Sequence, residues 1–553
     1  MTYASAGALL ACAVLGWRYV ARARRMLHLL QLEHYENARL FVWLRRREEL
    51  ADGAALSAVS VIVCGALALV RNSPVELIVW LVLCAVLVAV WRREPRRADI
   101  TPLVFTERAR RLFVGALLVP AVGVLLGVVL ALALGSDVPL ALAALVLAVC
   151  TLACPWLVTG ANAALAPVQR HINRRFEESA RATLASVAPV VVGITGSYGK
   201  TTTKVCVGAV LAEHDPTLIT PASFNSYLGV IRTINEHLQA AHRNFVVEMG
   251  MYRAGDIAEL CELVRPQIGV LTAIGPVHLE RMGTIEAIAD AKAELALALP
   301  PDGRLVANGD DPRCREIASR VSVDTVLYAI EHPDAHVRAE NIVLADGRTH
   351  FELVIGGERV AVSSGLLGRH NVSNLLAAAA VGHLRGLSSA EIARGLAGIT
   401  PPEHRLQPVP NPRAGIVVID DAYNSNPAGA AAALEVLHSH PAKRRILVTP
   451  GMVELGDQEA ELNEAFGRQA AAACDHVILV GRQRTRPIDR GLRAAGFSPE
   501  AITVVRDIAE VTAVLARFTR AGDVVLFEND LPDMYSEPDS PAPAAPPMVA
   551  GAA

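Results

Sequence analysis

The fold of most of the chain is decided by one stretch, Val190-Val-Val-Gly-Ile-Thr-Gly-Ser-Tyr-Gly-Lys-Thr-Thr-Thr203. The run of valines predicts a buried strand, and the residues after the last glycine predict the start of a helix. The glycines at 193, 196 and 199 allow backbone N–H groups to turn toward phosphate oxygens, and the helix N-terminus adds a favourable dipole. Lys200 is expected to reach a nucleotide's β- and γ-phosphates, and the Thr201 hydroxyl to bind Mg²⁺. The stretch therefore predicts a phosphate-binding loop, although Ile194 stands where the generic motif has its first glycine.

An α/β alternation continues on both sides of a proline-rich stretch at residues 401–412. The expected strands before it are 190–194, 245–248, 268–272 and 304–307, and those after it are 416–419, 446–449, 476–480, 502–505 and 524–527. Short β-branched strands that alternate with Ala-rich helices are typical of a parallel sheet covered by helices. We expect a central ATP-binding domain at 189–400, a Rossmann-like C-terminal domain at 401–535, and a disordered Pro/Ala-rich tail at 536–553.

The N-terminal part is apolar, which explains why the chain is 52% hydrophobic and only 19% charged. Five apolar runs cover residues 3–17, 54–70, 75–91, 112–135 and 138–160. A membrane-spanning helix needs about 20 apolar residues. The pattern predicts a transmembrane module of about five helices at 1–160, followed by a juxtamembrane linker helix at 161–188.

The charge distribution predicts the orientation of this module. Residues 1–182 have a net charge of +8 and residues 183–553 a net charge of −11, and eight and seven arginines fall in the connections 18–50 and 92–111. Basic connections stay in the cytoplasm. We therefore expect a multi-pass protein of the inner membrane with its catalytic domains in the cytoplasm. The runs contain no charged residue except Glu76, which favours an anchor over a pump. The acidic soluble part argues against a nucleic-acid binder.

Lysine is rare in the chain. There are 48 arginines but only four lysines, at 200, 204, 292 and 443. A lysine that persists in such a sequence indicates a role that a guanidinium cannot fill. Lys292 therefore becomes a candidate functional residue, although it lies outside the phosphate loop.

Seven ordered motifs resemble the Mur ligase family, and its tripeptide:D-alanyl-D-alanine ligase branch most closely. They are Gly193-Ile-Thr-Gly-Ser-Tyr-Gly-Lys-Thr-Thr-Thr203, Val246-Val-Glu-Met-Gly250, Thr272-Ala-Ile-Gly-Pro-Val-His-Leu-Glu280, Ala291-Lys-Ala-Glu294, Asn308-Gly-Asp-Asp-Pro312, Gly368-Arg-His-Asn-Val-Ser-Asn374 and Ile419-Asp-Asp-Ala-Tyr-Asn-Ser-Asn-Pro427. The resemblance covers about residues 190–530. It implies an ATP-dependent, ADP-forming acid–amino-acid ligase in peptidoglycan or related cell-envelope synthesis.

The resemblance also implies a role for each matching residue. It implies an acyl-phosphate intermediate, two Mg²⁺ ions and a carbamylated lysine. ATP would contact Gly196, Ser197, Gly199, Lys200, Thr201, Thr202, Asn308, Asn371, Arg405 and Asp421; the metal ions would contact Thr201, Glu248, His278 and Lys292, and Lys200, His278 and Lys292 would be catalytic. The implied partners are a carboxylate-bearing envelope precursor, an amino acid or short peptide, and membrane lipid.

Two departures from the family pattern keep the substrate open. The membrane module occupies the place of the domain that binds the UDP-sugar peptide. The segment 524–533 is acidic where the tripeptide ligases have a basic turn, so D-alanyl-D-alanine is not carried over. The alternatives are a poly-γ-glutamate-type homopolymer synthase and a non-catalytic ATP-binding scaffold of the envelope machinery.

Overall fold

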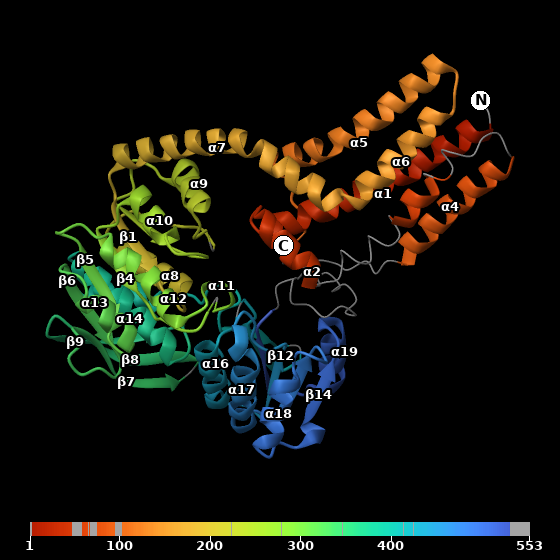
Figure 1. Cartoon of the computed structure of the whole chain (residues 1–553). Helices are drawn as coiled ribbons and strands as arrows, with labels where there is room; N and C mark the ends of the chain where they lie inside the picture. The colour runs from red at the N-terminus through yellow and green to blue at the C-terminus, as the bar shows by residue number, and fades with distance from the viewer. Residues whose placement is uncertain are drawn as a thin grey trace. The chain divides into compact units, whose positions relative to one another are not determined.

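The chain divides between Ile172 and Asn173 into two compact units (Figure 1). The computed structural model describes residues 3–46, 58–64, 66, 74–93, 102–222, 224–277, 279–345, 347–412, 414–423 and 425–530. The predicted disordered tail at 536–553 lies outside these residues. Each unit has its own core, and the two are described in turn.

The N-terminal unit is helical. Its helices are α1 (Tyr3–Leu32), α2 (Asn37–Arg46), α4 (Pro74–Arg93), α5 (Glu107–Leu134), α6 (Val138–Leu152) and the first part of α7 (Cys154–Val187). Trp80 is fully buried in its core, against Gly7. A Cβ at Gly127 would lie 2.8 Å from the Pro139 carbonyl oxygen, so this glycine permits close packing of α5 on α6.

The prediction of five spanning helices is not confirmed. Among the described residues, α5 is the one helix long and apolar enough to cross a membrane. The run at 138–160 is broken near Ala153, and α6 and α7, which pass the same test together, are bent by 77°. The fully described apolar part of α4, Ile78–Ala89, is shorter, and most of the run at 54–70 lies outside the described residues.

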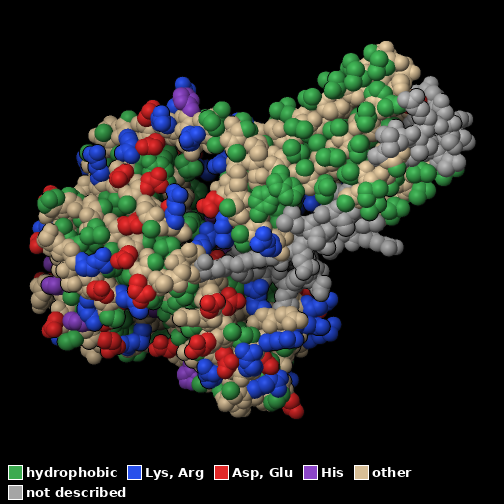
Figure 2. All heavy atoms as spheres, viewed as in Figure 1, with side chains coloured by type: hydrophobic (Ala, Val, Ile, Leu, Met, Phe, Trp, Pro, Cys, Tyr) green, Lys and Arg blue, Asp and Glu red, His purple; other side chains and the backbone are tan. Residues whose placement is uncertain are grey.

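The apolar residues of α5 face outward. Only 11% of its most apolar window is buried. Its exposed large side chains are Val114, Leu118, Val119, Val122, Leu125, Leu126, Val129, Leu130, Leu132 and Leu134. Figure 2 shows hydrophobic side chains gathered over the helices of this unit, with few charges between them. A core helix would bury such residues, and exposed apolar surfaces of this kind occur at contacts with other proteins or with membranes.

The α/β unit begins with a nine-stranded sheet of order β2-β3-β1-β4-β5-β6-β7-β8-β9. Its strands are β1 (Val190–Thr195), β2 (Thr217–Ile219), β3 (Asn244–Glu248), β4 (Ile268–Leu271), β5 (Arg304–Asn308), β6 (Asp324–Ala329), β7 (Val337–Ala345), β8 (Arg348–Ile355) and β9 (Glu358–Ser364). The strands are parallel up to the β6–β7 pair, and β7, β8 and β9 pair antiparallel.

Helices cover both faces of this sheet. One face packs on α8 (Lys200–Ala212), α14 (Arg369–Leu384) and α15 (Ser389–Ala397). The other packs on α9 (Tyr227–His237), α10 (Asp256–Val264), α12 (Ile285–Leu297) and α13 (Pro312–Ser319). Alternate residues of β1 point to opposite faces of the sheet. Val192 packs in the core under α8, α14 and α15, and Val191 packs in the core under α9, α10, α12 and α13.

Strand β1 is the point at which the strand order reverses. It pairs with β3 on one side and β4 on the other. Open α/β sheets bind their ligands beyond the carboxyl ends of the strands at such a point. The loop that follows β1 therefore lies at the expected binding crevice.

The C-terminal sheet has the order β10-β11-β15-β12-β13-β14. Its strands are β10 (Gln407–Asn411), β11 (Ile416–Asp421), β12 (Arg444–Thr449), β13 (His476–Val480), β14 (Ile502–Val505) and β15 (Asp523–Glu528). Its faces pack on α16 (Pro427–Ser439), α17 (Glu459–Ala473) and α18 (Arg486–Ala494), and on α19 (Ile508–Phe518). Part of the proline-rich stretch forms β10, an antiparallel edge strand, where prolines are tolerated.

The predicted α/β fold with a parallel central sheet and a second α/β domain is confirmed. The segment 161–188, expected to be a linker helix, lies almost entirely within α7. Unpredicted elements are the edge strands β2 and β10, the interior strand β6, and the antiparallel strands β7, β8 and β9.

Candidate active site

The turn after β1 is held against the end of β4 without room for a side chain. A Cβ on Gly196 would lie 1.9 Å from Thr272 Oγ1 and 3.0 Å from the Ala273 backbone nitrogen. The Ser197 N–H donates to the Ala273 carbonyl at 2.6 Å, and Thr272 Oγ1 donates to the Tyr198 carbonyl at 2.5 Å. The loop is therefore fixed by neighbouring backbone before any ligand binds.

A second contact fixes the start of α8. Gly199 caps this helix with φ 76°, and a Cβ there would lie 2.4 Å from Asn374 Oδ1. That oxygen accepts from the Thr203 hydroxyl at 3.1 Å, and Asn374 Nδ2 donates to Asn371 Oδ1 at 3.0 Å. Asn371, predicted to contact adenine, is buried in this chain and also donates to the Leu367 carbonyl.

Lys200 lies on the loop that it would serve. Its Nζ donates to the Gly196 carbonyl at 2.8 Å, and the side chain is half-buried. Burial lowers the pKa of Lys200, the charge of Arg405 lowers it further, and Glu248 opposes both. The ammonium is therefore placed where phosphate oxygens could replace the loop carbonyl as its acceptor.

Glu248 ends β3 as a buried carboxylate, 1% exposed. Its Oε2 accepts from Lys204 Nζ at 3.1 Å and its Oε1 from Asn225 Nδ2 at 3.0 Å. Burial alone raises the pKa of Glu248, but Lys204 and Lys200 outweigh it and hold the pKa below its usual value. Glu248 therefore carries a negative charge in the crevice.

Lys292 lies on α12 and is 2% exposed. Burial lowers its pKa well below the ordinary value, and the charge of Lys200 lowers it further against the opposing effect of Glu294 and Glu248. Burial of this kind favours the neutral amine over the ammonium. This amine lies close enough to Lys200 and Glu248 for their charges to act on it.

Asn308 is the last residue of β5 in the central sheet, and Thr201 is in the first turn of α8. Asn308 Nδ2 donates to the Thr272 carbonyl at 2.8 Å, and Asn308 Oδ1 accepts from the Asp310 N–H at 3.0 Å. Thr201 remains partly exposed. Asn308 is tied through the Thr272 carbonyl to the segment that packs on the loop, and Thr201 directly follows the loop.

Arg405 and Asp421 come from the C-terminal domain. The Arg405 guanidinium carbon lies 4.1 Å from the Tyr423 ring centroid, and its charge acts on both Lys200 and Asp421. Asp421 Oδ1 accepts from the Leu406 N–H at 3.0 Å. Burial raises the pKa of Asp421 to about 6, and burial beside Asp421 raises the pKa of Glu528 well above its usual value.

The structure thus brings most of the predicted residues to one crevice. His278 lies outside the described residues, and no cluster of three or more His, Cys, Asp or Glu suited to a metal occurs in the described part of the chain. The residues with unpredicted roles are Lys204, Asn225, Thr272, Asn374 and Glu528. The scarcity of lysine could have identified Lys204, whereas Asn225 carries no sequence signal.

Comparison with known proteins defines the class. The Mur ligase middle domain matches residues 194–382, and the Mur ligase glutamate ligase domain matches residues 404–528. The chain belongs to the Mur ligase family and is an ATP-dependent, ADP-forming carbon–nitrogen ligase that uses Mg²⁺.

Relatives of the chain indicate the branch of the Mur ligase family that it resembles. The UDP-N-acetylmuramoyl-tripeptide–D-alanyl-D-alanine ligase of Mycobacterium bovis is 34% identical over 422 residues, which are 70% of this chain and 82% of the relative. The Bacillus subtilis enzyme of the same name is 30% identical over 363 residues, 64% and 76% of the two chains. The MurF ligase of Thermotoga maritima in complex with ADP superposes with a TM-score of 0.59 at 27% identity, covering 66% of this chain and 82% of that one.

The buried pair of Lys204 and Glu248 yields a stability prediction. Lys204→Met leaves an uncompensated buried carboxylate and is expected to cost about 3–5 kcal/mol. The double variant Lys204→Met/Glu248→Gln is expected to unfold at a higher temperature than Lys204→Met alone. The exposed Lys443 provides the control, Lys443→Met, which should change little. Additive losses in the double variant, measured by thermal unfolding, would exclude this pairing.

The Asp421–Glu528 pair yields a pH prediction. Glu528 keeps its proton in the folded chain but releases it near pH 4.3 when unfolded, so stability falls as pH rises from about 4 through the folded pKa. Glu528→Gln keeps an acceptor for Ser425 and a donor for Asp421 without titrating. The variant should therefore unfold at a higher temperature than the natural chain at pH 8, and the gap should shrink toward pH 5.

The matched control is Glu500→Gln, at an exposed position. Its unfolding temperature should follow that of the natural chain at every pH. The gap for Glu528→Gln should be about 2–4 °C for each kcal/mol relieved. A gap that is constant from pH 5 to pH 9 would contradict a buried, protonated Glu528.

Proposed function

We propose that the chain is a membrane-anchored amide ligase that acts through an acyl phosphate in peptidoglycan or related cell-envelope synthesis. The observation that carries the chemistry is the burial of the Lys292 side chain on α12, near enough to Lys200 and Glu248 for their charges to act on it. A neutral lysine amine can take up CO₂ and release a proton, which converts it into an anionic oxygen ligand. Neither an ordinary buried ammonium nor an arginine could do so.

The membrane part of the proposal rests on α5. Its exposed apolar surface suits lipid, and its N-terminal turns carry Arg108, Arg110 and Arg111. Basic residues at the end of an apolar helix favour the cytoplasmic side. With the basic connection at 18–50, this supports a multi-pass anchor with the catalytic domains in the cytoplasm.

The proposed reaction has two steps. The acceptor carboxylate attacks the γ-phosphorus of ATP, which breaks the bond to the β-phosphate oxygen and gives an acyl phosphate and ADP. An amine then attacks the acyl carbon, and phosphate leaves as the tetrahedral intermediate collapses to the amide. Phosphoryl transfer depends mainly on positioning and charge stabilisation. Lys200 and the N–H groups of Gly196, Ser197 and Gly199 would hold the phosphates, and Thr202, also in the first turn of α8, would lie beside them.

Oxygen donors at the crevice fit magnesium. Glu248 and Thr201 would hold one ion, and carbamylated Lys292 with His278 a second; bound Mg²⁺ would neutralise phosphate charge. The Glu248 carboxylate already interacts with the ammonium groups of Lys204 and Lys200. A positive charge is therefore favoured beside it. A cation at Glu248 would compete with Lys204. In the absence of such a cation, Lys204 holds the Glu248 carboxylate in position.

The remaining predicted residues would bind the nucleoside. Asn308 and Asn371 would lie along adenine after exchanging their present partners, and Arg405 and Asp421 would reach phosphate and ribose. Arg405 already acts electrostatically on Lys200 although it belongs to the C-terminal domain. Closure of that domain over the nucleotide would complete the site, as hinged domains commonly do.

The relatives support an envelope precursor as acceptor and an amino acid or short peptide as the amine. They favour this function over a homopolymer synthase, because they are named as ligases of the muramoyl-tripeptide. We do not restrict the amine substrate to D-alanyl-D-alanine. The reason is Glu528, a buried acidic residue beside Asp421, which lies where the tripeptide ligases have a basic turn.

The test uses the purified full chain in detergent. ATP cleavage to ADP and phosphate should require both an envelope precursor and an amine. Lys292→Arg should lower that rate at least about a hundredfold, because the lost ligand removes several kcal/mol of charge stabilisation. Lys443→Arg should leave it unchanged.

A second readout isolates the carbamate. Lys292→Ala should regain part of its activity with added formate or acetate, because these carboxylates supply the missing oxygens. Full activity of Lys292→Arg would contradict a carbamate. Absence of amine-dependent ATP cleavage with every envelope precursor would favour the scaffold function.

A further inference from the structure

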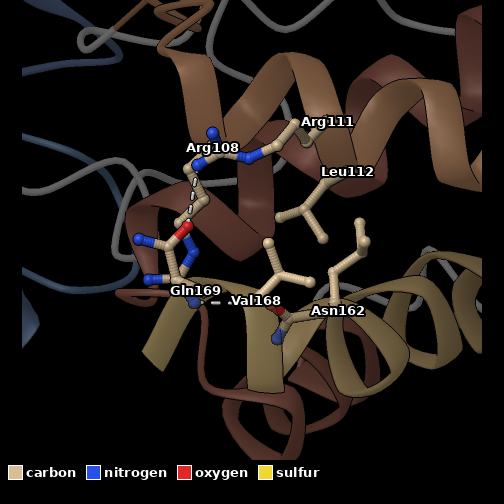
Figure 3. A pocket seen from close by; sticks show the side chains of 7 residues that line it. Arg108, Arg111, Leu112, Asn162, Val168 and Gln169 are labelled. Carbon is tan, nitrogen blue, oxygen red and sulfur yellow. Dashed lines mark hydrogen bonds between the residues drawn. The ribbon is translucent and has the colours of Figure 1, made fainter. Parts of the chain in front are cut away.

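A hollow in the N-terminal unit lies between the start of α5 and the middle of α7. It is a small hollow that opens to the surface. Its lining is Arg108, Arg111, Leu112, Asn162, Leu165, Val168 and Gln169. Figure 3 shows the two arginines on one helix facing the polar residues of the other.

Both arginines are positioned by neutral groups. Arg111 Nη2 donates to Gln169 Oε1 at 2.9 Å, and Arg108 Nη2 to Asn162 Oδ1 at 3.4 Å. The Arg108 guanidinium also stacks on Tyr35, 3.8 Å from the ring centroid. Throughout the described part of the chain no carboxylate pairs with either arginine, whereas Arg110 between them pairs with Glu107 at 2.9 Å.

The polar wall is built to hold these arginines in place. Asn162 is 9% exposed, and its Nδ2 donates to the Tyr35 carbonyl at 2.9 Å and to Asn37 Oδ1 at 2.8 Å. Its Oδ1 is therefore directed at Arg108. A guanidinium has five N–H donors, and the contacts of Arg108 and Arg111 described above occupy few of them. Two unneutralised positive charges that share one hollow favour an anion with several acceptor oxygens.

The rest of the lining is apolar and comes from both helices. It consists of Leu112, Leu165 and Val168, and Val168 is 48% exposed. The exposed apolar surface of α5 begins at Val114, six residues after Arg108, or about 9 Å along the helix. The hollow therefore lies where this apolar surface starts, and it combines anion recognition with contact for hydrocarbon.

We propose that the hollow binds the phosphate group of an anionic lipid, with Arg108 and Arg111 on the phosphate and the apolar side chains along the first part of an acyl chain. Inorganic phosphate offers the arginines the same oxygens as a lipid phosphate group. It would, however, leave the apolar side chains of the hollow without a partner. The proposal rests on the membrane placement given above and not on ligase chemistry.

The test measures lipid binding to the detergent-solubilised full chain by native mass spectrometry. The probes are short-chain phosphatidylglycerol, phosphatidylcholine and inorganic phosphate. The natural chain should retain phosphatidylglycerol more tightly than the other two. Arg108→Gln/Arg111→Gln should weaken that binding at least about tenfold.

The matched control removes the same amount of charge from exposed positions on α5 and α7. Arg110 and Arg170 are exposed residues of α5 and α7, and Arg110→Gln/Arg170→Gln should bind phosphatidylglycerol as the natural chain does. Thermal unfolding checks that both variants fold, and Arg108→Lys/Arg111→Lys should bind weakly because it keeps the charge but loses the forked donors.

Three results would overturn the proposal. Equal weakening in both glutamine variants would indicate general charge attraction. Inorganic phosphate that binds as tightly as phosphatidylglycerol would exclude the lipid. Undiminished binding by Arg108→Lys/Arg111→Lys and Arg108→Gln/Arg111→Gln would place the lipid elsewhere. ATP cleavage by these variants is a separate readout, so failure here leaves the proposed ligase activity untouched.

Discussion

The absence of a side chain at Gly196 is the constraint on which the catalytic unit depends. Its turn passes so close to Thr272 and Ala273 that a methyl group would overlap them. This contact ties the turn after β1 to the segment after β4, where the Ser197 N–H donates to the Ala273 carbonyl. The positions of Lys200 and the first turn of α8 follow from that turn.

Electrostatics in the crevice follow from the same packing. Lys200, Lys204, Lys292 and the carboxylate of Glu248 lie near the ends of strands β1 and β3. Glu248 is buried and forms an ion pair with Lys204. The arrangement keeps Glu248 ionised while it pushes Lys292 toward the neutral amine. One crevice thus holds a fixed cation for phosphate, an oxygen donor for a metal and an amine that can be modified, each set by burial and neighbouring charge.

The sequence predicted the parts of this structure that have local signals. Valine runs identified the central strands, and glycine spacing with Lys200 identified the loop. It did not predict β10, because prolines conceal an edge strand, nor the break near Ala153, because an apolar run looks the same whether straight or bent. Lys204 and Glu528 acquire their roles from partners 44 and 103 residues away, Glu248 and Ser425, and no local pattern encodes such contacts.

The central claim is that the cramped turn at Gly196 builds the nucleotide site, and calorimetric titration of Mg-ATP into Gly196→Ala tests it most directly. Gly160→Ala is the control, because no atom lies within 4 Å of its added Cβ. The account predicts that Gly196→Ala loses at least about tenfold in ATP affinity, worth about 1.4 kcal/mol, while its helix and strand content stay those of the natural chain. Unchanged affinity in a folded Gly196→Ala protein would contradict it.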